Sequence, residues 1–319
     1  MKTAALRIYP ARESVDGDGN RLDIQFEIDG RRFDVFIAAR DCRLRVEPEA
    51  LVALALLPAM RAACECIEVD ADLDADFLEG IGKIQARFSD WWPRLSVVKV
   101  KPSRVGQPPA SPSGSRVGSF FSLGLDSGYT LCRRQEEISD LIYVHGFDLP
   151  LAEMAMRDRV SQAVRRVARC FGKAPLEIET NMRSFLDRFV PWPQAHGAAL
   201  AAVALLLPDD FQLVYISATH IAEHLIPWGS HPETDPLWSR PGRQLIHYGT
   251  EVLRADKAAV ILEDDVLLNH LRVCWEGTAR AGDCLNCGTC EKCLRTMIDL
   301  CAAGGQPPFP TFARQLDSG

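Results

Sequence analysis

The cysteines of this chain are unevenly spaced, and the crowded ones could hold a metal ion. Six of the 11 cysteines fall between positions 274 and 301. Turns with two-residue spacers can converge three thiolates on one cation, and that spacing joins Cys287, Cys290 and Cys293. The fourth ligand is either Cys274 or Cys284. Four thiolates suit a closed, structural Zn²⁺ site, with an iron–sulfur cluster as the chemical alternative.

A second stretch, SFFSLGLDSG at 119–128, places serines, glycines and an aspartate where an apolar strand meets a helical pattern. Gly124 can take a positive φ and let the backbone approach a ligand, and Ser122 and Ser127 offer hydroxyls. The N–H groups and the dipole at a helix start favour a bound anion. The stretch therefore predicts a phosphate-binding loop, although not a Walker A loop, because no G-K-[ST] follows. The purely structural alternative is a serine-rich turn that caps the helix, with Asp126 near its N-terminus.

The elements that must position these motifs alternate between strands and helices from residue 119 onward. Such alternation predicts an α/β fold, with a parallel sheet and helices on both faces. Ligands bind beyond the carboxyl ends of the strands in such sheets. The predicted strands are 118–124, 139–146, 175–181 and 211–220, and the predicted helices are 150–172 and 196–207.

The N-terminal third predicts a small α+β domain of its own. Apolar and polar residues alternate over 21–39 around Asp29-Gly30, which is a strong hairpin signal. The stretches 48–63 and 76–95 have helical periods. A region rich in Pro, Ser and Gly then predicts a linker. We expect an N-terminal domain (1–101), a linker (102–118), an α/β domain (119–303) and a C-terminal tail (304–319).

Composition excludes some classes of partner. The chain is 47% hydrophobic and carries a formal charge of −7, which argues against unspecific nucleic-acid binding. The first 14 residues lack the apolar core of a signal peptide, and no apolar run reaches the length of a membrane span. We expect a cytoplasmic protein without membrane contact. The sequence leaves the oligomeric state open, with a homodimer as one candidate.

The two motifs together resemble one family. Ser122-Leu123-Gly124-Leu125-Asp126-Ser127 resembles the PP-loop, S-G-G-x-D-S, of the ATP pyrophosphatases, with Leu123 in place of the first glycine. The cysteine stretch at 274–293 is similar to the zinc knuckle of the QueC-like enzymes, the 7-cyano-7-deazaguanine synthases. In that family a lone cysteine precedes the crowded ones, so the resemblance implies Cys274 as the fourth ligand. It covers about 119–303 and leaves the N-terminal domain unmatched.

The resemblance also implies roles for individual residues. Beside the loop itself, the backbone from Val144 to Gly146 would hold the adenine of ATP, and Arg254 and Lys257 would contact the pyrophosphate. Asp126 would orient Mg²⁺, and Asp126, Ser127 and Lys257 would be catalytic. The loop after the strand at 211–220 would recognise a planar substrate. The side chains suited to that task are His196, Trp228, His231, Asp235 and Trp238.

The implied function is that of an ATP-dependent C–N ligase. A heterocyclic carboxylate such as 7-carboxy-7-deazaguanine would be activated as an acyl-adenylate with release of pyrophosphate. Ammonia or another amine would then give an amide or a nitrile. The N-terminal domain and the altered loop favour, as one alternative, transfer to an amine on a protein or metabolite. Further alternatives are a tRNA-modifying PP-loop enzyme and a nucleotide-binding protein with a decayed loop.

Overall fold

The computed structural model of the chain describes residues 5–106, 114–276 and 281–316. The chain forms two compact units, each assembled from separate segments. Unit 1 contains Met1–Arg116, Ile178–Ile216 and Ile226–His247, and unit 2 contains Val117–Glu177, Ser217–Leu225 and Tyr248–Gly319.

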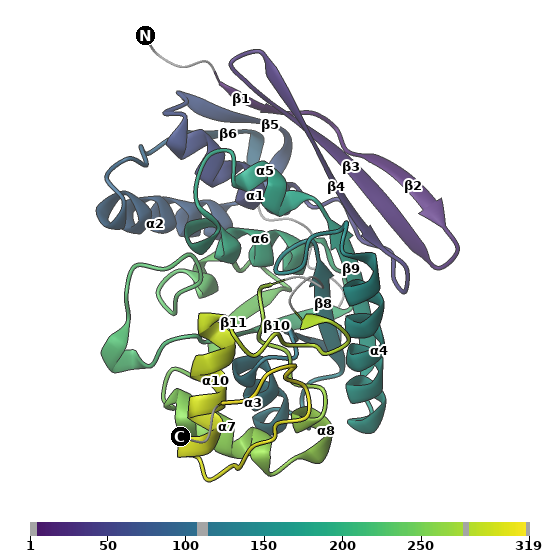
Figure 1. The fold of residues 1–319 in the computed structure, drawn as a ribbon. Helices are drawn as coiled ribbons and strands as arrows, with labels where there is room; N and C mark the ends of the chain where they lie inside the picture. The colour runs from purple at the N-terminus through teal and green to yellow at the C-terminus, as the bar shows by residue number, and fades with distance from the viewer. Residues whose placement is uncertain (1–4, 107–113, 277–280, 317–319) are drawn as a thin grey trace. The chain divides into compact units, whose positions relative to one another are not determined.

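Unit 1 is built on a mixed sheet with the strand order β4-β3-β1-β5-β6, and β2 pairs with β3. The antiparallel ribbon β2–β4 is drawn in purple in Figure 1. Asp29 and Gly30 connect β3 to β4 with φ values of +51° and +72°, the left-handed pair that a two-residue hairpin requires. The predicted hairpin is confirmed. The strands are β1 (Leu6–Ile8), β2 (Arg12–Asp16), β3 (Gly19–Ile28), β4 (Arg31–Ala39), β5 (Cys66–Asp74) and β6 (Lys99–Gly106).

Two apolar helices form the core of unit 1. α1 (Pro48–Arg61) and α6 (Trp192–Leu206) pack against each other, and both are buried over most of their surface. A helix that is apolar on all sides gains stability only in an interior. This packing brings a segment far along the chain into the N-terminal unit. The remaining elements of the unit are α2 (Ala75–Trp91), α5 (Met182–Leu186), most of β10 (Phe211–Ser217), most of β11 (Gln244–Tyr248) and the 3₁₀ turn η2 (Asp235–Trp238).

The units therefore differ from the linear division expected from the sequence. Residues 178–216 and 226–247 belong to unit 1, not to a continuous domain over 119–303. The predicted linker is also partly strand, because residues 102–106 continue β6 in parallel pairing with β5. The linker residues 107–113 lie outside the described part of the chain.

Unit 2 contains the first part of the strand–helix alternation that the sequence predicted, whereas the predicted helix at 196–207 and most of the predicted strand at 211–220 lie in unit 1. β7 (Arg116–Phe120) and β8 (Asp140–His145) are parallel neighbours, and α3 (Leu125–Arg133) connects them. α4 (Met154–Cys170) packs on β8 and leads to β9 (Ala174–Thr180). The mixed α/β class is thus confirmed. The rest of the unit comprises the 3₁₀ turn η1 (Ala222–His224), α7 (Arg254–Leu262), α8 (Asp265–Leu268) and α10 (Glu291–Ala302).

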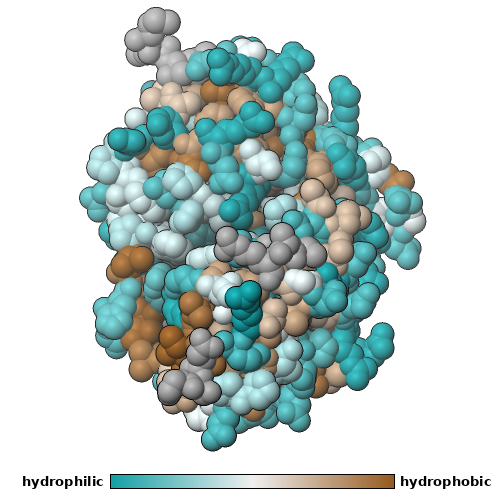
Figure 2. All heavy atoms as spheres, viewed as in Figure 1, coloured by the Kyte–Doolittle hydropathy of each residue, from teal (hydrophilic) through white to brown (hydrophobic). Residues whose placement is uncertain are grey.

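The helices α3, α7 and α10 of unit 2 form a contiguous group, because α7 packs against both α3 and α10. Figure 2 shows a mostly hydrophilic face with apolar side chains over α10, where Leu294 and Ile298 are exposed. Exposed apolar side chains are common on folded proteins and assign no role by themselves. Among the described residues, no helix is both long enough and apolar enough to span a membrane.

Candidate functional site

The junction between β7 and α3 is a tight loop whose left-handed residue is Leu123. Leu123 has a φ of +64°, a conformation that costs a non-glycine L-residue about 1 kcal/mol or more. Gly124, which could have taken a positive φ, has a φ of −84°, so the left-handed conformation lies at the neighbouring residue. The turning residue stands where the PP-loop pattern has its first glycine. Leu123 is 3% exposed, and burial of its side chain offsets the backbone strain.

The first turn of α3 is open to a ligand. Gly124 is the N-cap residue and provides no side-chain cap, so the first N–H groups of the helix keep their donor capacity. The Ser127 hydroxyl is engaged inside the loop, since it accepts from the Ser122 N–H and donates to the Gly124 carbonyl, both at 3.2 Å. The Ser122 side chain is exposed. Ser122 is therefore the loop hydroxyl that a ligand can reach, while Ser127 shapes the loop.

The Asp126 carboxylate is held by two cations from α7. Lys257 Nζ lies 3.1 Å from Asp126 Oδ1, and Arg254 Nη1 lies 3.1 Å from Asp126 Oδ2. Lys257 is only 1% exposed and also donates to the Ala218 carbonyl at 2.7 Å. The structure thus brings together three of the residues predicted for the nucleotide site. It pairs Asp126 with cations rather than leaving it free for Mg²⁺.

Arg254 connects this loop to the helix that follows the cysteines. Its Nε lies 2.8 Å from Asp299 Oδ2, and its Nη2 donates to Thr296 Oγ1 at 3.0 Å. Both acceptors belong to α10. One guanidinium therefore joins α3 and α10 through hydrogen bonds to charged groups, which are stronger than neutral ones.

Four buried cysteines form the metal-binding group, and Cys274 is the fourth member. The sulfur atoms of Cys274, Cys287, Cys290 and Cys293 all lie within 4.8 Å of one another. The Sγ–Sγ distances are 3.9 Å for Cys274–Cys290 and 3.8 Å for Cys287–Cys293. A tetrahedron with Zn–S bonds of about 2.3 Å has edges of about 3.8 Å. The group could therefore hold a metal such as zinc, and Cys284 is not part of it.

The surroundings of two of the four sulfurs, those of Cys274 and Cys287, favour the thiolate, the form that binds metal. The pKa of Cys290 is raised, chiefly by burial, and that of Cys293 is raised, chiefly by its hydrogen bond to the Cys274 sulfur. Burial opposes ionisation of Cys287, but hydrogen bonds from the Thr289 hydroxyl and from the N–H groups of Thr289 and Cys290 outweigh burial and lower its pKa. The pKa of Cys274 is also lowered, chiefly by a hydrogen bond from the Cys293 thiol. Such outer contacts orient metal ligands.

Asn286 organises the cysteine region, and the sequence analysis missed it. Its Oδ1 accepts from the N–H groups of Val273 and Cys274 at 2.8 and 3.1 Å. Its Nδ2 donates to the Leu271 carbonyl at 2.7 Å and to Thr311 Oγ1 at 2.9 Å. Thr311 lies in the predicted C-terminal tail, which here packs on the cysteine region. The available signal in the sequence was an asparagine between Cys284 and Cys287. If that stretch is buried, the amide must be hydrogen-bonded, because buried polar groups almost always have partners.

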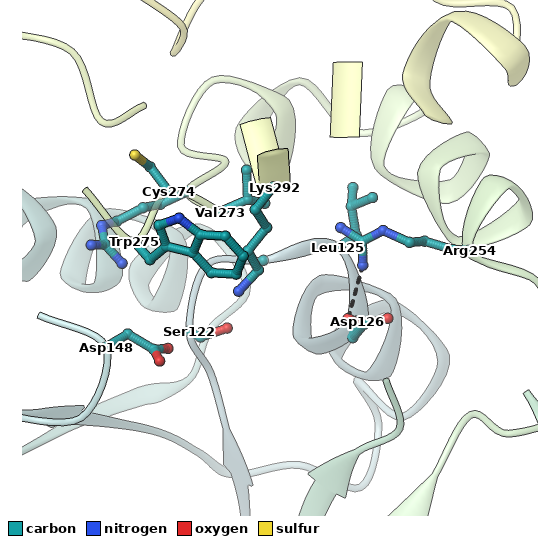
Figure 3. Close-up of a pocket in the computed structure, with 11 residues that line it drawn as sticks. Ser122, Leu125, Asp126, Asp148, Arg254, Val273, Cys274, Trp275 and Lys292 are labelled. Atoms are coloured by element: carbon teal, nitrogen blue, oxygen red, sulfur yellow. Dashed lines mark hydrogen bonds and ion pairs between the residues drawn. The ribbon is translucent and has the colours of Figure 1, made fainter. Parts of the chain in front are cut away.

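A pocket opens between the loop and the cysteine region, entirely within unit 2. It is lined by Ser122 and 124–126 of the loop, by Asp148 and Arg254, and by 272–275 and Lys292 beside the cysteines. Figure 3 shows the Asp126–Arg254 ion pair on one side of the pocket and Trp275 and Asp148 on the other. Trp275 is half-exposed, and Lys292 Nζ lies 5.8 Å from the centre of its ring. The lining combines cations, hydroxyl and amide donors, and an aromatic face.

Arg272 is the notable member of that lining. It is 4% exposed, and its Nε and Nη2 have no hydrogen-bond partner among the described residues. Its backbone is fixed, because its N–H donates to the Leu123 carbonyl at 2.9 Å. The sequence analysis did not select Arg272, since one arginine ahead of a cysteine carries no pattern.

The residues predicted to contact a planar substrate lie in unit 1. Asp235 and Trp238 are fully buried. The Asp235 carboxylate accepts from Ser230 Oγ at 2.6 Å, from His247 Nδ1 at 2.7 Å and from the His231 N–H at 3.2 Å. This network holds the loop of unit 1 together.

The other predicted substrate residues are parts of aromatic contacts in the same unit. The His231 ring packs edge-on against Trp91 at 4.7 Å, and burial lowers its pKa. His196 packs against Trp228 with ring centres 5.7 Å apart. Their roles in substrate recognition stay predictions.

The predicted adenine contacts lie at the end of β8. Val144 is buried, and Gly146 turns the chain with a φ of +98° while its N–H donates to the Leu149 carbonyl. Between them, His145 is buried and forms a 2.9 Å contact with Glu177. Burial alone would raise the pKa of Glu177, but hydrogen bonds from His145, Ser161 and Arg165 outweigh burial and hold it at about 2.

Comparison with known proteins adds no family to this geometry. The chain matches no protein-family model, no curated protein and no solved structure. The site must therefore be interpreted from its own residues.

Proposed function

We propose that unit 2 binds ATP at the β7–α3 loop and uses it to activate a carboxylate. The observation that carries this proposal is the arrangement around the pocket. The uncapped start of α3, the exposed residue Ser122 and the buried Arg272 line the same cavity. Two guanidinium nitrogens of Arg272 have no hydrogen-bond partner among the described residues. Helix N-termini and arginine forks are the groups with which proteins bind phosphates.

The chemistry follows from the resemblance to the PP-loop enzymes. A carboxylate oxygen of the substrate attacks the α-phosphorus of ATP, the bond to the bridging oxygen breaks, and pyrophosphate leaves. The acyl-adenylate then loses AMP when a nitrogen nucleophile attacks its carbonyl carbon. Positive groups fixed beside the leaving pyrophosphate stabilise the charge that develops on it. Lys257 and Arg254 are such groups, and their contacts with Asp126 hold them at the loop.

The four cysteines fit a structural rather than a catalytic metal. All four ligand positions are protein sulfurs and all four are buried, so no position remains for substrate. When bound, the metal would hold 272–275 and the start of α10 beside the loop. Zinc and ATP thus have separate tasks in this proposal, and Mg²⁺ would accompany the nucleotide phosphates.

The test is an incubation of the full-length protein with Mg-ATP, ammonium and 7-carboxy-7-deazaguanine, with AMP and the deazaguanine product followed by mass spectrometry. AMP together with an amide or nitrile supports the proposal. Ser122→Ala should raise the KM for ATP by about 5- to 10-fold through loss of one hydrogen bond to a charged group. The control Ser14→Ala, on the exposed strand β2, should leave the KM unchanged. AMP formed equally well without any carboxylate would contradict the ligase chemistry.

One observation favours a second candidate, a nucleotide-binding protein without pyrophosphate release. Both oxygens of Asp126 are engaged by Arg254 and Lys257, which leaves this carboxylate little capacity to orient Mg²⁺. Such a protein would bind ATP but form no AMP with any carboxylate. Calorimetric titration with ATP, beside the product assay, separates the two candidates.

A further inference from the structure

Arg272 carries a buried charge that the described residues leave largely unsatisfied. It is 4% exposed, and two of its three guanidinium nitrogens, Nε and Nη2, have no hydrogen-bond partner there. Taking a charge out of water without pairing it is strongly unfavourable. A protein that holds an arginine in this way requires an anion to complete the site.

The position of Arg272 is built by its neighbours rather than left to a flexible side chain. Its own N–H donates to the Leu123 carbonyl. The next two N–H groups, of Val273 and Cys274, donate to Asn286 Oδ1 at 2.8 and 3.1 Å. The segment is therefore tied to the loop at one end and to the four-cysteine group at the other.

A second feature of the same pocket points to an anion. The first turn of the nine-residue helix α3 opens into the pocket and has no side-chain cap. Lys292 adds a further positive charge. Asp126 is already paired with Arg254 and Lys257. Asp148, the other acidic lining residue, has no such pairing among the described residues. The charged lining residues are thus three cations, Arg254, Arg272 and Lys292, and two carboxylates, so the lining has a net positive charge.

We propose that Arg272, Lys292 and the first turn of α3 form an oxyanion subsite that binds the terminal phosphates of the nucleotide. This assignment rests on the proposed function, in which those phosphates leave as pyrophosphate. Arg272 offers a planar fork that can contact two phosphate oxygens, and Lys292 offers a point charge. The carboxylate of the substrate has the same oxyanion chemistry and is the other source that the test must separate.

The experiment is calorimetric titration of the full-length, zinc-loaded protein with inorganic pyrophosphate and, separately, with 7-carboxy-7-deazaguanine. Arg272→Gln should weaken pyrophosphate binding by about 30-fold, since bonds to a charged group are lost. Arg272→Lys keeps the charge without the fork and should lose less affinity. The control is Arg133→Gln, at an exposed arginine in the last turn of α3. This variant should bind pyrophosphate as the wild type does. Equal thermal melting of the variants shows that folding is intact.

The outcomes distinguish this inference from the proposed function. Pyrophosphate binding that is absent from the wild type, or unchanged in Arg272→Gln, overturns the subsite, even if AMP is formed in the product assay. Loss of binding for 7-carboxy-7-deazaguanine alone overturns the phosphate assignment, because the substrate carboxylate is then the occupant. Pyrophosphate binding that depends on Arg272, without AMP formation under any condition, supports the subsite and counts against the ligase.

Discussion

Two buried arginines, one in each unit, show opposite ways of treating a charge. Arg243 of unit 1 is 1% exposed, and Arg272 of unit 2 is 4% exposed. Burial lowers the pKa of Arg243 to about 10. Its guanidinium nevertheless donates to a full set of backbone carbonyls, those of Ala204, Leu207, Pro208 and Phe211. Arg272 has two nitrogens without a hydrogen-bond partner in the part of the chain that the structure describes.

The difference separates scaffold from site. The carbonyls around Arg243 include the end of α6, where a helix has orphan acceptors and the negative end of its dipole. Arg243 donates to the carbonyls at that helix end, so its charge stabilises the fold and its donors are not available to a ligand. Arg272 keeps its donors and faces a pocket. A buried charge with all its bonds made serves stability, and one without them marks a place for a ligand.

Of the changes considered, metal removal should have the largest effect on the stability of unit 2 and on anion binding by Arg272. Chelation, or Cys293→Ser, should cost unit 2 several kcal/mol, because metal binding energy is folding energy for such clusters. It should also abolish pyrophosphate binding, since Cys274 anchors the segment that carries Arg272. Metal content by mass spectrometry and thermal melting measure the effect. The control Cys170→Ser, an exposed cysteine outside the cluster, should retain metal and stability.

Methionine at each arginine tests the comparison directly. Arg243→Met should lower the free energy of unfolding by about 3–5 kcal/mol, because several buried carbonyls lose their donor. Arg272→Met should raise it by about 1–2 kcal/mol, because an unpaired buried charge is removed. Urea denaturation of both variants provides the measurement. Equal destabilisation by the two substitutions would show that Arg272 is as fully bonded as Arg243.

Glu177 is a buried acid that is fully engaged, as Arg243 is, and its contribution to stability should depend on pH. Hydrogen bonds from His145, Ser161 and Arg165 oppose the effect of burial and hold the pKa of Glu177 at about 2, below its ordinary 4.5. A depressed carboxyl pKa stabilises the fold above 4.5, and this contribution is lost as the pH falls through 2.

Glu177→Gln should therefore cost about 2 kcal/mol near neutral pH, a figure discounted because solvent screens the half-exposed Arg165. The difference between variant and wild type should shrink as the pH falls below about 4. Unfolding free energies measured by urea titration across that range give the result. A difference that is constant with pH would mean that the lost bonds are not ionic.

The smallest effect is expected at Leu123. Glycine relieves the cost of a positive φ but loses the buried side chain, and alanine loses the side chain while retaining the strain. Leu123→Ala should therefore be less stable than Leu123→Gly by about 1 kcal/mol. This reverses the usual order of the two residues within helices. Thermal melts of the pair decide the question, and a more stable alanine variant would show that the loop relaxes to a negative φ.

Local patterns accounted for the elements and for part of the site. Asp29-Gly30 predicted its hairpin because only a left-handed pair closes a two-residue loop. The apolar period of 48–63 predicted α1, and the spacing of Cys287, Cys290 and Cys293 predicted their convergence. These features depend on residues close in sequence. Their geometry is encoded by spacing alone.

Distant contacts decided the rest. The choice of Cys274 over Cys284 depends on Asn286, which holds the chain at 273–274. The place of α6 in unit 1 depends on its packing with α1, and the linear division of the chain could not include it. The role of Arg272 depends on missing partners, which a sequence does not record.

The sequence by itself thus determined part of the secondary structure, the three crowded thiolates and the loop at the start of α3. The tertiary structure decided the fourth cysteine, which the spacing left open and the family resemblance implied. It alone decided the left-handed residue of the loop and the arginine whose donors are unused among the described residues. The physical reason is that backbone propensity and spacing act over a few residues. Hydrogen-bond saturation and burial depend on which distant segments meet.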